Sequence, residues 1–223
     1  MSKVDKAYQQ IKEAILNGQY RPSQRLAEED LAATLGMSRN TIRLALGQLE
    51  KERLVESEAF KGKRVAVIDL DETLQILEAR ELLEGYLAGR AAENMEVGAL
   101  HELAEILQRM EIAQSQEKFD QYSRLNGRFH HVIHQVAQKP VISQFISDLR
   151  TRLIRFQYRT VLVPGRAAQS FHEHQQIYAA LAAHDVQAAD AAMRLHVAHV
   201  RQTILTHQTL LDLGGEIYIG DRI

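Results

Sequence analysis

Residues 22–46, with the sequence PSQRLAEEDLAATLGMSRNTIRLAL, decide the fold of the first part of the chain. Their apolar residues recur at helical spacing on both sides of a glycine, which predicts two helices joined by a tight turn. The positions expected on the buried faces are Leu26, Leu31 and Leu35, then Ile42, Leu46 and Leu49. Gly36 suits a left-handed turn residue, and Ser38 suits the N-cap of the second helix.

The exposed face of that second helix is polar and basic. Its first turns carry Ser38, Arg39, Asn40, Thr41 and Arg43. In a helix-turn-helix these positions meet phosphates and base edges in the major groove of DNA. We expect one of the two arginines to read a guanine and the other to hold a phosphate. The alternative is that they are ordinary solvated helix charges.

The segments around this motif complete a small domain. A helix is expected over residues 8–16, before the motif. After it, residues 54–57 and 64–68 read as two strands around a basic turn, a β-hairpin wing. The expected wing tip is Phe60, Lys61, Gly62 and Lys63, where the glycine would let the backbone approach the minor groove.

Charge divides the 223-residue chain in two. Residues 1–68 hold 12 Lys and Arg against 9 Asp and Glu, whereas residues 69–223 hold 15 against 20. A basic head on an acidic body suits a nucleic-acid module joined to a part with another task. The chain has no cysteine, no apolar run of about 20 residues and no apolar signal core, so we expect no membrane span and a cytoplasmic protein.

Throughout the second part of the chain, apolar residues recur at the spacing of a helix. Six helices are expected, over residues 71–95, 97–113, 117–138, 141–161, 168–183 and 186–211. Helices of this length predict an antiparallel bundle. The fold class is therefore mainly α. The expected organisation is a winged helix-turn-helix over 1–68, a hinge over 69–73, an all-helical domain over 74–212 and a tail over 213–223.

These residues carry a resemblance to the GntR family of bacterial transcription regulators. Ile11, Ile15, Pro22, Leu26, Leu31, Gly36, Ser38, Arg39, Ile42, Arg43, Leu46, Leu49, Gly62 and Val65 match its winged helix-turn-helix. The helical half resembles the ligand-binding FCD domain of the FadR subfamily, and six helices resemble its VanR-like branch. The matching signatures are Arg80–Glu84, then Asn126, Phe129 and His130, then Glu173, His174, Ile177, Asp185 and His196. Pro22-Ser23 stands where the family usually has Pro-Gly.

Three histidines suggest a metal site. His130, His174 and His196 fall on separate expected helices, each on an apolar face. Converging imidazoles suit a divalent transition metal, Zn²⁺ first, with Ni²⁺ or Mn²⁺ as alternatives. The resemblance places the family's metal-binding aspartate at Asn126, a neutral residue that would be a weak fourth ligand or an outer hydrogen-bonding group. The alternative is a set of core histidines without a metal.

Three further residues are candidates for an effector site. Arg80 interrupts an apolar stripe, so it would either pair internally with Glu84 or hold the carboxylate of an effector beside the metal. Arg152 and Tyr158 are weaker candidates for the same pocket.

The resemblance favours a homodimeric, ligand-responsive repressor that binds a pseudo-palindromic operator in double-stranded DNA and answers to a small carboxylate metabolite. Two other functions fit parts of the sequence. One is a metal-dependent hydrolase or lyase with a three-histidine centre, in which Glu84 or Glu173 would serve as the base. The other is a DNA-binding protein whose helical half only dimerises.

Overall fold

The structure is a computed structural model that describes residues 2–16, 19–58, 61–66 and 70–207, with only the backbone at residues 16 and 154–159. The chain forms two compact units, and the boundary between them in the sequence lies between residues 69 and 70. None of the helices within these ranges is long and apolar enough to cross a membrane.

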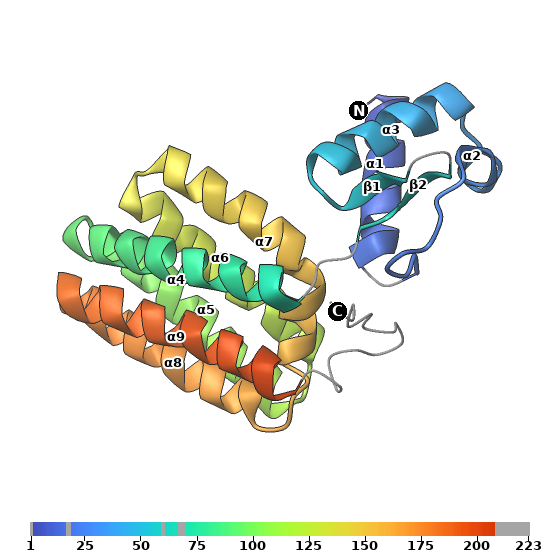
Figure 1. Cartoon of the computed structure of the whole chain (residues 1–223). Helices are drawn as coiled ribbons and strands as arrows, with labels where there is room; N and C mark the ends of the chain where they lie inside the picture. Colours follow the sequence, from blue (N-terminus) through green and yellow to red (C-terminus); the bar gives the residue numbers. More distant parts are fainter. Residues whose placement is uncertain (1, 17–18, 59–60, 67–69, 208–223) are drawn as a thin grey trace. The chain divides into compact units, whose positions relative to one another are not determined.

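The first unit is a winged helix-turn-helix, as predicted from the sequence. Its elements are α1 (Lys3–Leu16), α2 (Glu28–Leu35), α3 (Arg39–Lys51), β1 (Val55–Glu58) and β2 (Gly62–Val65) (Figure 1). The two strands pair antiparallel, with Val55 opposite Val65. Expected strand residues 67 and 68 and the wing-tip residue Phe60 lie outside the described residues.

Local chemistry fixes the turn between α2 and α3. Gly36 ends α2 with a φ of 63°, the left-handed conformation that glycine adopts without strain. Ser38 then caps α3, since its hydroxyl accepts a hydrogen bond of 3.1 Å from the backbone N–H of Thr41. Ile42, Leu46 and Leu49 are buried, so the opposite face of α3 remains outside.

The turn at Pro22-Ser23 places a serine in a glycine-type conformation. Ser23 has a φ of 59° and is exposed. Its backbone N–H donates to the carbonyl of Val65 at 3.0 Å, and the next residues continue this pairing along β2. The turn therefore ties the segment before α2 to the wing, and its geometry explains why a glycine would suit this position.

The second unit is a helical bundle, again as predicted. Its helices are α4 (Leu70–Glu93), α5 (Val97–Ser115), α6 (Phe119–Ala137), α7 (Pro140–Thr160), α8 (Arg166–Ala182) and α9 (Val186–Thr206) (Figure 1). In the described residues α4 begins at Leu70, so residues 70–73 of the expected hinge are helical. Residues 208–211 of the last expected helix and the expected tail lie outside the description.

Packing between α4 and α9 brings two backbones close together. A Cβ atom on Gly85 would lie 2.6 Å from Cγ of Arg194, so only glycine fits there without displacing that side chain. The main core lies deeper, around Leu87, Leu103 and Phe129. Phe145 on α7 lies outside this core and is 62% exposed.

Candidate functional site

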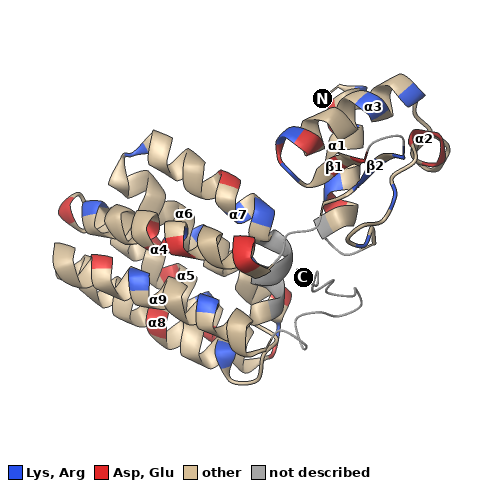
Figure 2. Cartoon of the chain, viewed as in Figure 1, with Lys and Arg blue, Asp and Glu red and all other residues tan. Residues whose placement is uncertain are grey.

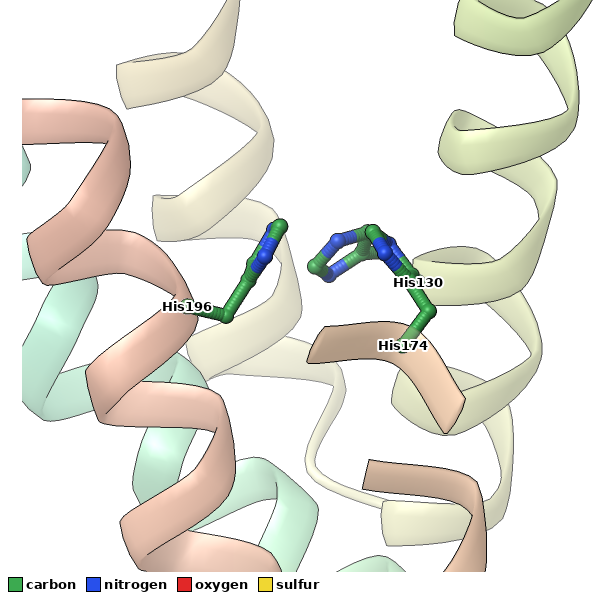
Figure 3. Close-up of side chains that lie close together, drawn as sticks. All are labelled: His130, His174 and His196. Atoms are coloured by element: carbon green, nitrogen blue, oxygen red, sulfur yellow. The ribbon is translucent and has the colours of Figure 1, made fainter. Parts of the chain in front are cut away.

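Three helices bring the predicted histidines together. His130 comes from α6, His174 from α8 and His196 from α9, and their rings turn toward one another (Figure 3). The ring centroids are 5.5 Å apart for His130 and His174, 5.3 Å for His130 and His196, and 4.6 Å for His174 and His196. One nitrogen from each ring lies within 4.8 Å of the others, so the three rings are close enough to form a candidate metal site.

A fixed oxygen lies beside Nδ1 of each ring. For His174 the oxygen is the backbone carbonyl of Ser170, at 2.5 Å. For His196 it is Oε2 of Glu173, at 2.7 Å, and for His130 it is Oε2 of Glu84, at 3.0 Å. The hydrogen-bonded neighbours of His174 and His196 orient these two rings and leave Nε2 free to bind a metal, whereas Nδ1 of His130 lies near Glu84 without forming a hydrogen bond to it in the described residues.

Burial keeps these imidazoles neutral. It lowers the pKa of His130 to about 3, an effect that Arg150 strengthens and the nearby Glu84 opposes. Burial also lowers the pKa of His174 well below its usual value and lowers that of His196, although Glu173 works against the second shift. A neutral imidazole offers the lone pair that a metal needs.

Unpartnered polar atoms mark the middle of the cluster. Nε2 of His130 and Nε2 of His174 are buried, and neither has a hydrogen-bond partner among the described residues. The same holds for Oδ1 of Asn126, one turn before His130 on α6. Buried polar atoms normally have partners, so this set of donors fits a bound metal ion.

Two buried carboxylates support the cluster and also hold arginines. Oε1 of Glu84 is 2.7 Å from the Arg80 guanidinium, so the internal pair, one of the two alternatives considered for Arg80, is present. Oε2 of Glu173 accepts from Arg166 at 3.0 Å. Burial alone would raise the pKa of Glu84, but Arg80, Arg150 and His130 hold it well below its usual value. Both acids therefore act as anions.

The cluster opens on a small cavity of about 50 Å³, which we call the inner cavity. Its lining includes Arg80, Asn126, His130, Arg150, Arg166 and His196. None of the lining residues that the structure describes is acidic. Nη1 of Arg80 and both Nε and Nη1 of Arg166 are buried without hydrogen-bond partners among the described residues. Guanidinium donors without partners beside a metal-type cluster suit an anionic group.

Sequence reasoning missed two of these arginines. Arg166 is brought inward because Gly165, with a φ of 80°, begins α8 immediately before it. Arg150 lies on α7. The Pro164-Gly165 pair could have indicated that a helix begins at Arg166, whereas no feature of the sequence singles out Arg150. The structure separates Arg152 from the inner cavity and pairs it with Glu72, and the Tyr158 side chain lies outside the described residues.

The predicted DNA-facing residues lie on one exposed surface of the first unit. Arg39, Asn40 and Arg43 are exposed and Thr41 is half-buried. Arg43 pairs with Glu28 of α2 at 3.2 Å. Figure 2 shows basic residues on α3. The sequence reading passed over Leu44, an apolar residue 52% exposed among these polar ones.

The wing supplies the other predicted contacts. Lys61 is exposed and pairs with Glu58 at 2.7 Å. Gly62 has a φ of 90°, a conformation that favours glycine. Lys63 is half-buried and its ammonium group pairs with Glu50 of α3, so it also ties the wing to that helix.

Fold and surface chemistry together define a winged-helix DNA-binding protein with a helical second unit. Residues 3–65 match the family described as "Bacterial regulatory proteins, gntR family", and residues 75–199 match the FCD domain. The chain belongs to the GntR family of transcription regulators and carries an FCD domain. This membership decides against the hydrolase or lyase, because the family is non-enzymatic.

Individual relatives agree with this assignment. The HTH-type transcriptional repressor GlaR of Escherichia coli (strain K12) is 29% identical over 199 residues, covering 85% of this chain and 90% of that protein. The repressor RspR of the same organism is 22% identical over 197 residues, covering 88% and 86%. The solved structure of E. coli McbR/YncC has the same fold, with a TM-score of 0.73, 23% identity and coverage of 96% and 99%.

Proposed function

We propose that this regulator is a cytoplasmic repressor whose affinity for its operator changes when a small carboxylate binds at a metal centre in the second unit. The observation that carries the proposal is the inner cavity. It brings the imidazoles of His130 and His196, with His174 behind them, together with guanidinium nitrogens of Arg80 and Arg166 that have no hydrogen-bond partner in the described residues. Repression is supported by relatives named as transcriptional repressors.

His130, His174 and His196 would hold the metal through Nε2, with Asn126 beside them. Nitrogen donors suit Zn²⁺, and Ni²⁺ or Mn²⁺ also accept them. When bound, the ion supplies a positive centre that an anionic oxygen can approach. Arg80 and Arg166 orient that anion by donating hydrogen bonds, and their pairing with Glu84 and Glu173 keeps the guanidiniums in place.

On the first unit, α3 would enter the major groove of DNA. Arg39 and Arg43 would contact guanine or phosphate, with Asn40 and Thr41 beside them. Leu44 offers an apolar contact for a thymine methyl group. Lys61 and Lys63, flanking Gly62, would meet the backbone at the minor groove.

A dimer would place two such helices on a pseudo-palindromic operator. Exposed apolar side chains on two helices that pack together suit a second copy of the chain. Leu82 is 57% exposed and Tyr86 41% exposed on α4, and Leu195 is 49% exposed on α9. We expect Leu82→Glu to yield monomers in light scattering, whereas Val97→Glu, at an 84% exposed position on α5, should leave the dimer intact.

The test of the whole proposal combines metal analysis with operator binding. Purified protein should contain close to one divalent transition metal per chain, and chelation should remove it. A duplex selected from a random library serves as the operator. A carboxylate that raises the melting temperature of the metal-loaded protein should change the affinity for that duplex. Protein without metal that responds to no carboxylate would instead support a helical unit that only dimerises.

A further inference from the structure

A second, larger hollow adjoins the inner cavity. It has a volume of about 630 Å³ and is lined by residues from α6, from the α6–α7 turn and from α7; we call it the outer groove. The two hollows share three lining residues, Ser123, Asn126 and Arg150. The two hollows therefore adjoin at these residues, so a ligand whose head lies near Arg80 and His130 has the outer groove next to it.

The inner cavity and the outer groove differ in size, so they would hold different parts of a ligand. The inner cavity, at about 50 Å³, has room for a few water-sized groups, which is the scale of a carboxylate. A ligand larger than a carboxylate must place its remaining atoms outside the inner cavity. The residues shared by the two hollows place the outer groove, between α6 and α7, next to that carboxylate. The outer groove is thus the natural place for the part of the effector that distinguishes one carboxylate from another.

The lining of the outer groove specifies the chemistry of that part. None of its described lining residues is acidic or a large apolar residue, and the neutral ones include Ser143, Ser147, Thr151 and Gln135. Two of the lining residues, His134 and Ser143, each carry a buried polar atom, Nε2 and Oγ respectively, that has no hydrogen-bond partner in the described part of the chain. Such atoms lose free energy unless a ligand or water satisfies them.

We infer that the outer groove binds a hydroxylated chain, so that the effector is a polyhydroxylated carboxylate rather than an alkyl acid. This inference rests on the proposed function, since it assigns the head group to the inner cavity. An alkyl tail would leave His134 and Ser143 unpartnered and would strip water from the neighbouring hydroxyls and amides. A row of hydroxyl groups can both donate to and accept from them.

Gly127 allows a direct test. It lines the outer groove, and a Cβ atom there would have no atom within 4 Å beyond its own stretch of helix. Gly127→Leu should therefore fold, since leucine favours helices more than glycine does, and its side chain should occupy part of the groove. The matched control is Gly98→Leu on α5, where a Cβ atom also meets nothing and which lies outside the groove.

Titration calorimetry of the metal-loaded protein would compare acetate, hexanoate and three six-carbon acids, gluconate, galactonate and mannonate, with metal content checked afterwards. At least one of the three should bind tenfold or more tighter than both acetate and hexanoate. Gly127→Leu should reduce its affinity to about that of acetate, without changing acetate binding, and Gly98→Leu should have no effect. Ser143→Ala, which removes one unpartnered hydroxyl, should weaken the same acid severalfold.

Several results would overturn the inference. One is hexanoate binding as tightly as the best hydroxylated acid. Others are unchanged affinity for that acid in Gly127→Leu, or an equal loss for acetate and the acid. Failure of acetate and every other acid to bind the metal-loaded protein would be a different result, because it would refute the proposed function and this inference with it.

Discussion

Oε2 of Glu173 lies 2.7 Å from Nδ1 of His196 and 3.0 Å from the Arg166 guanidinium, so one carboxylate orients both a candidate ligand and a candidate anion-binding group. Its other oxygen accepts from His199. Glu173→Gln should lower metal affinity about 10- to 100-fold, because the ring loses its anionic partner. Competition with a chromogenic chelator would measure this. Glu111→Gln, at an exposed position on α5, is the control, and equal affinities in both variants would contradict the role.

Asn126 can be tested by restoring the charge that the family usually has there. Oδ1 of Asn126 is buried without a partner in the described residues and lies on the same helix as His130, one turn earlier. Asn126→Asp should raise metal affinity at least tenfold, because a carboxylate is a stronger ligand for Zn²⁺ than an amide oxygen. Asn94→Asp, at the end of α4, should leave it unchanged. Equal affinity in the Asn126 variant and the parent would place this side chain outside the metal site.

Acid should destabilise the metal-free protein from about pH 6 downward. Burial lowers the pKa of His130 to about 3 and that of His134 to about 4, whereas both titrate near 6.5 when unfolded. The unfolded chain therefore binds protons that the folded chain does not, and each histidine costs about 1.4 kcal/mol of unfolding free energy per pH unit between these values. The lowered pKa of Glu84 acts in the same direction at lower pH.

Urea unfolding followed by circular dichroism between pH 7 and pH 4 would measure this slope. His134→Gln removes one of the buried histidines whose pKa is lowered and should make the slope shallower by the share of one group, up to about 1.4 kcal/mol per pH unit. Gln135→Asn, an exposed change at a neighbouring residue that does not titrate, should leave the slope as it is. A slope that does not change in His134→Gln would show that this histidine is not held neutral.

The two units should respond separately to mutation. Arg43→Ala removes an exposed guanidinium from α3 and should weaken operator binding by about 1–3 kcal/mol. It should not change metal content or carboxylate binding, because it lies in the first unit. Arg128→Ala, on the exposed face of α6 where Arg128 pairs with Glu102, is the control. Equal loss of DNA and carboxylate binding in Arg43→Ala would argue against this division.

Ser23 stores a small amount of backbone strain that glycine would relieve. With a φ of 59° it occupies the left-handed region, which is unfavourable for a residue with a Cβ atom. Ser23→Gly should raise the free energy of unfolding by about 1 kcal/mol. Ser23→Ala keeps the Cβ atom and should give no such gain. A destabilised glycine variant would contradict this account.

Much of the fold could be predicted because local signals and tertiary structure agree. Gly36, Ser38 and the apolar spacing on both sides of them fix the turn without help from the rest of the chain. The histidine positions followed from apolar faces and the family resemblance. The partners could not be predicted, because Glu173 meets His196 only through the packing of α8 on α9. The spacing of residues along the sequence likewise does not reveal that Arg152 forms an ion pair with Glu72.

Helix α8 carries four groups of the site on one stripe: Arg166, Ser170, Glu173 and His174. A helix turns by about 100° per residue. Inserting or deleting a single residue between positions 166 and 174 would therefore rotate the site residues before the change out of line with the site residues after it. The length of this segment is thus constrained as strictly as its composition. A scan of single-residue insertions and deletions along the chain should find that this segment does not tolerate them. Single substitutions would not reveal this constraint on its length.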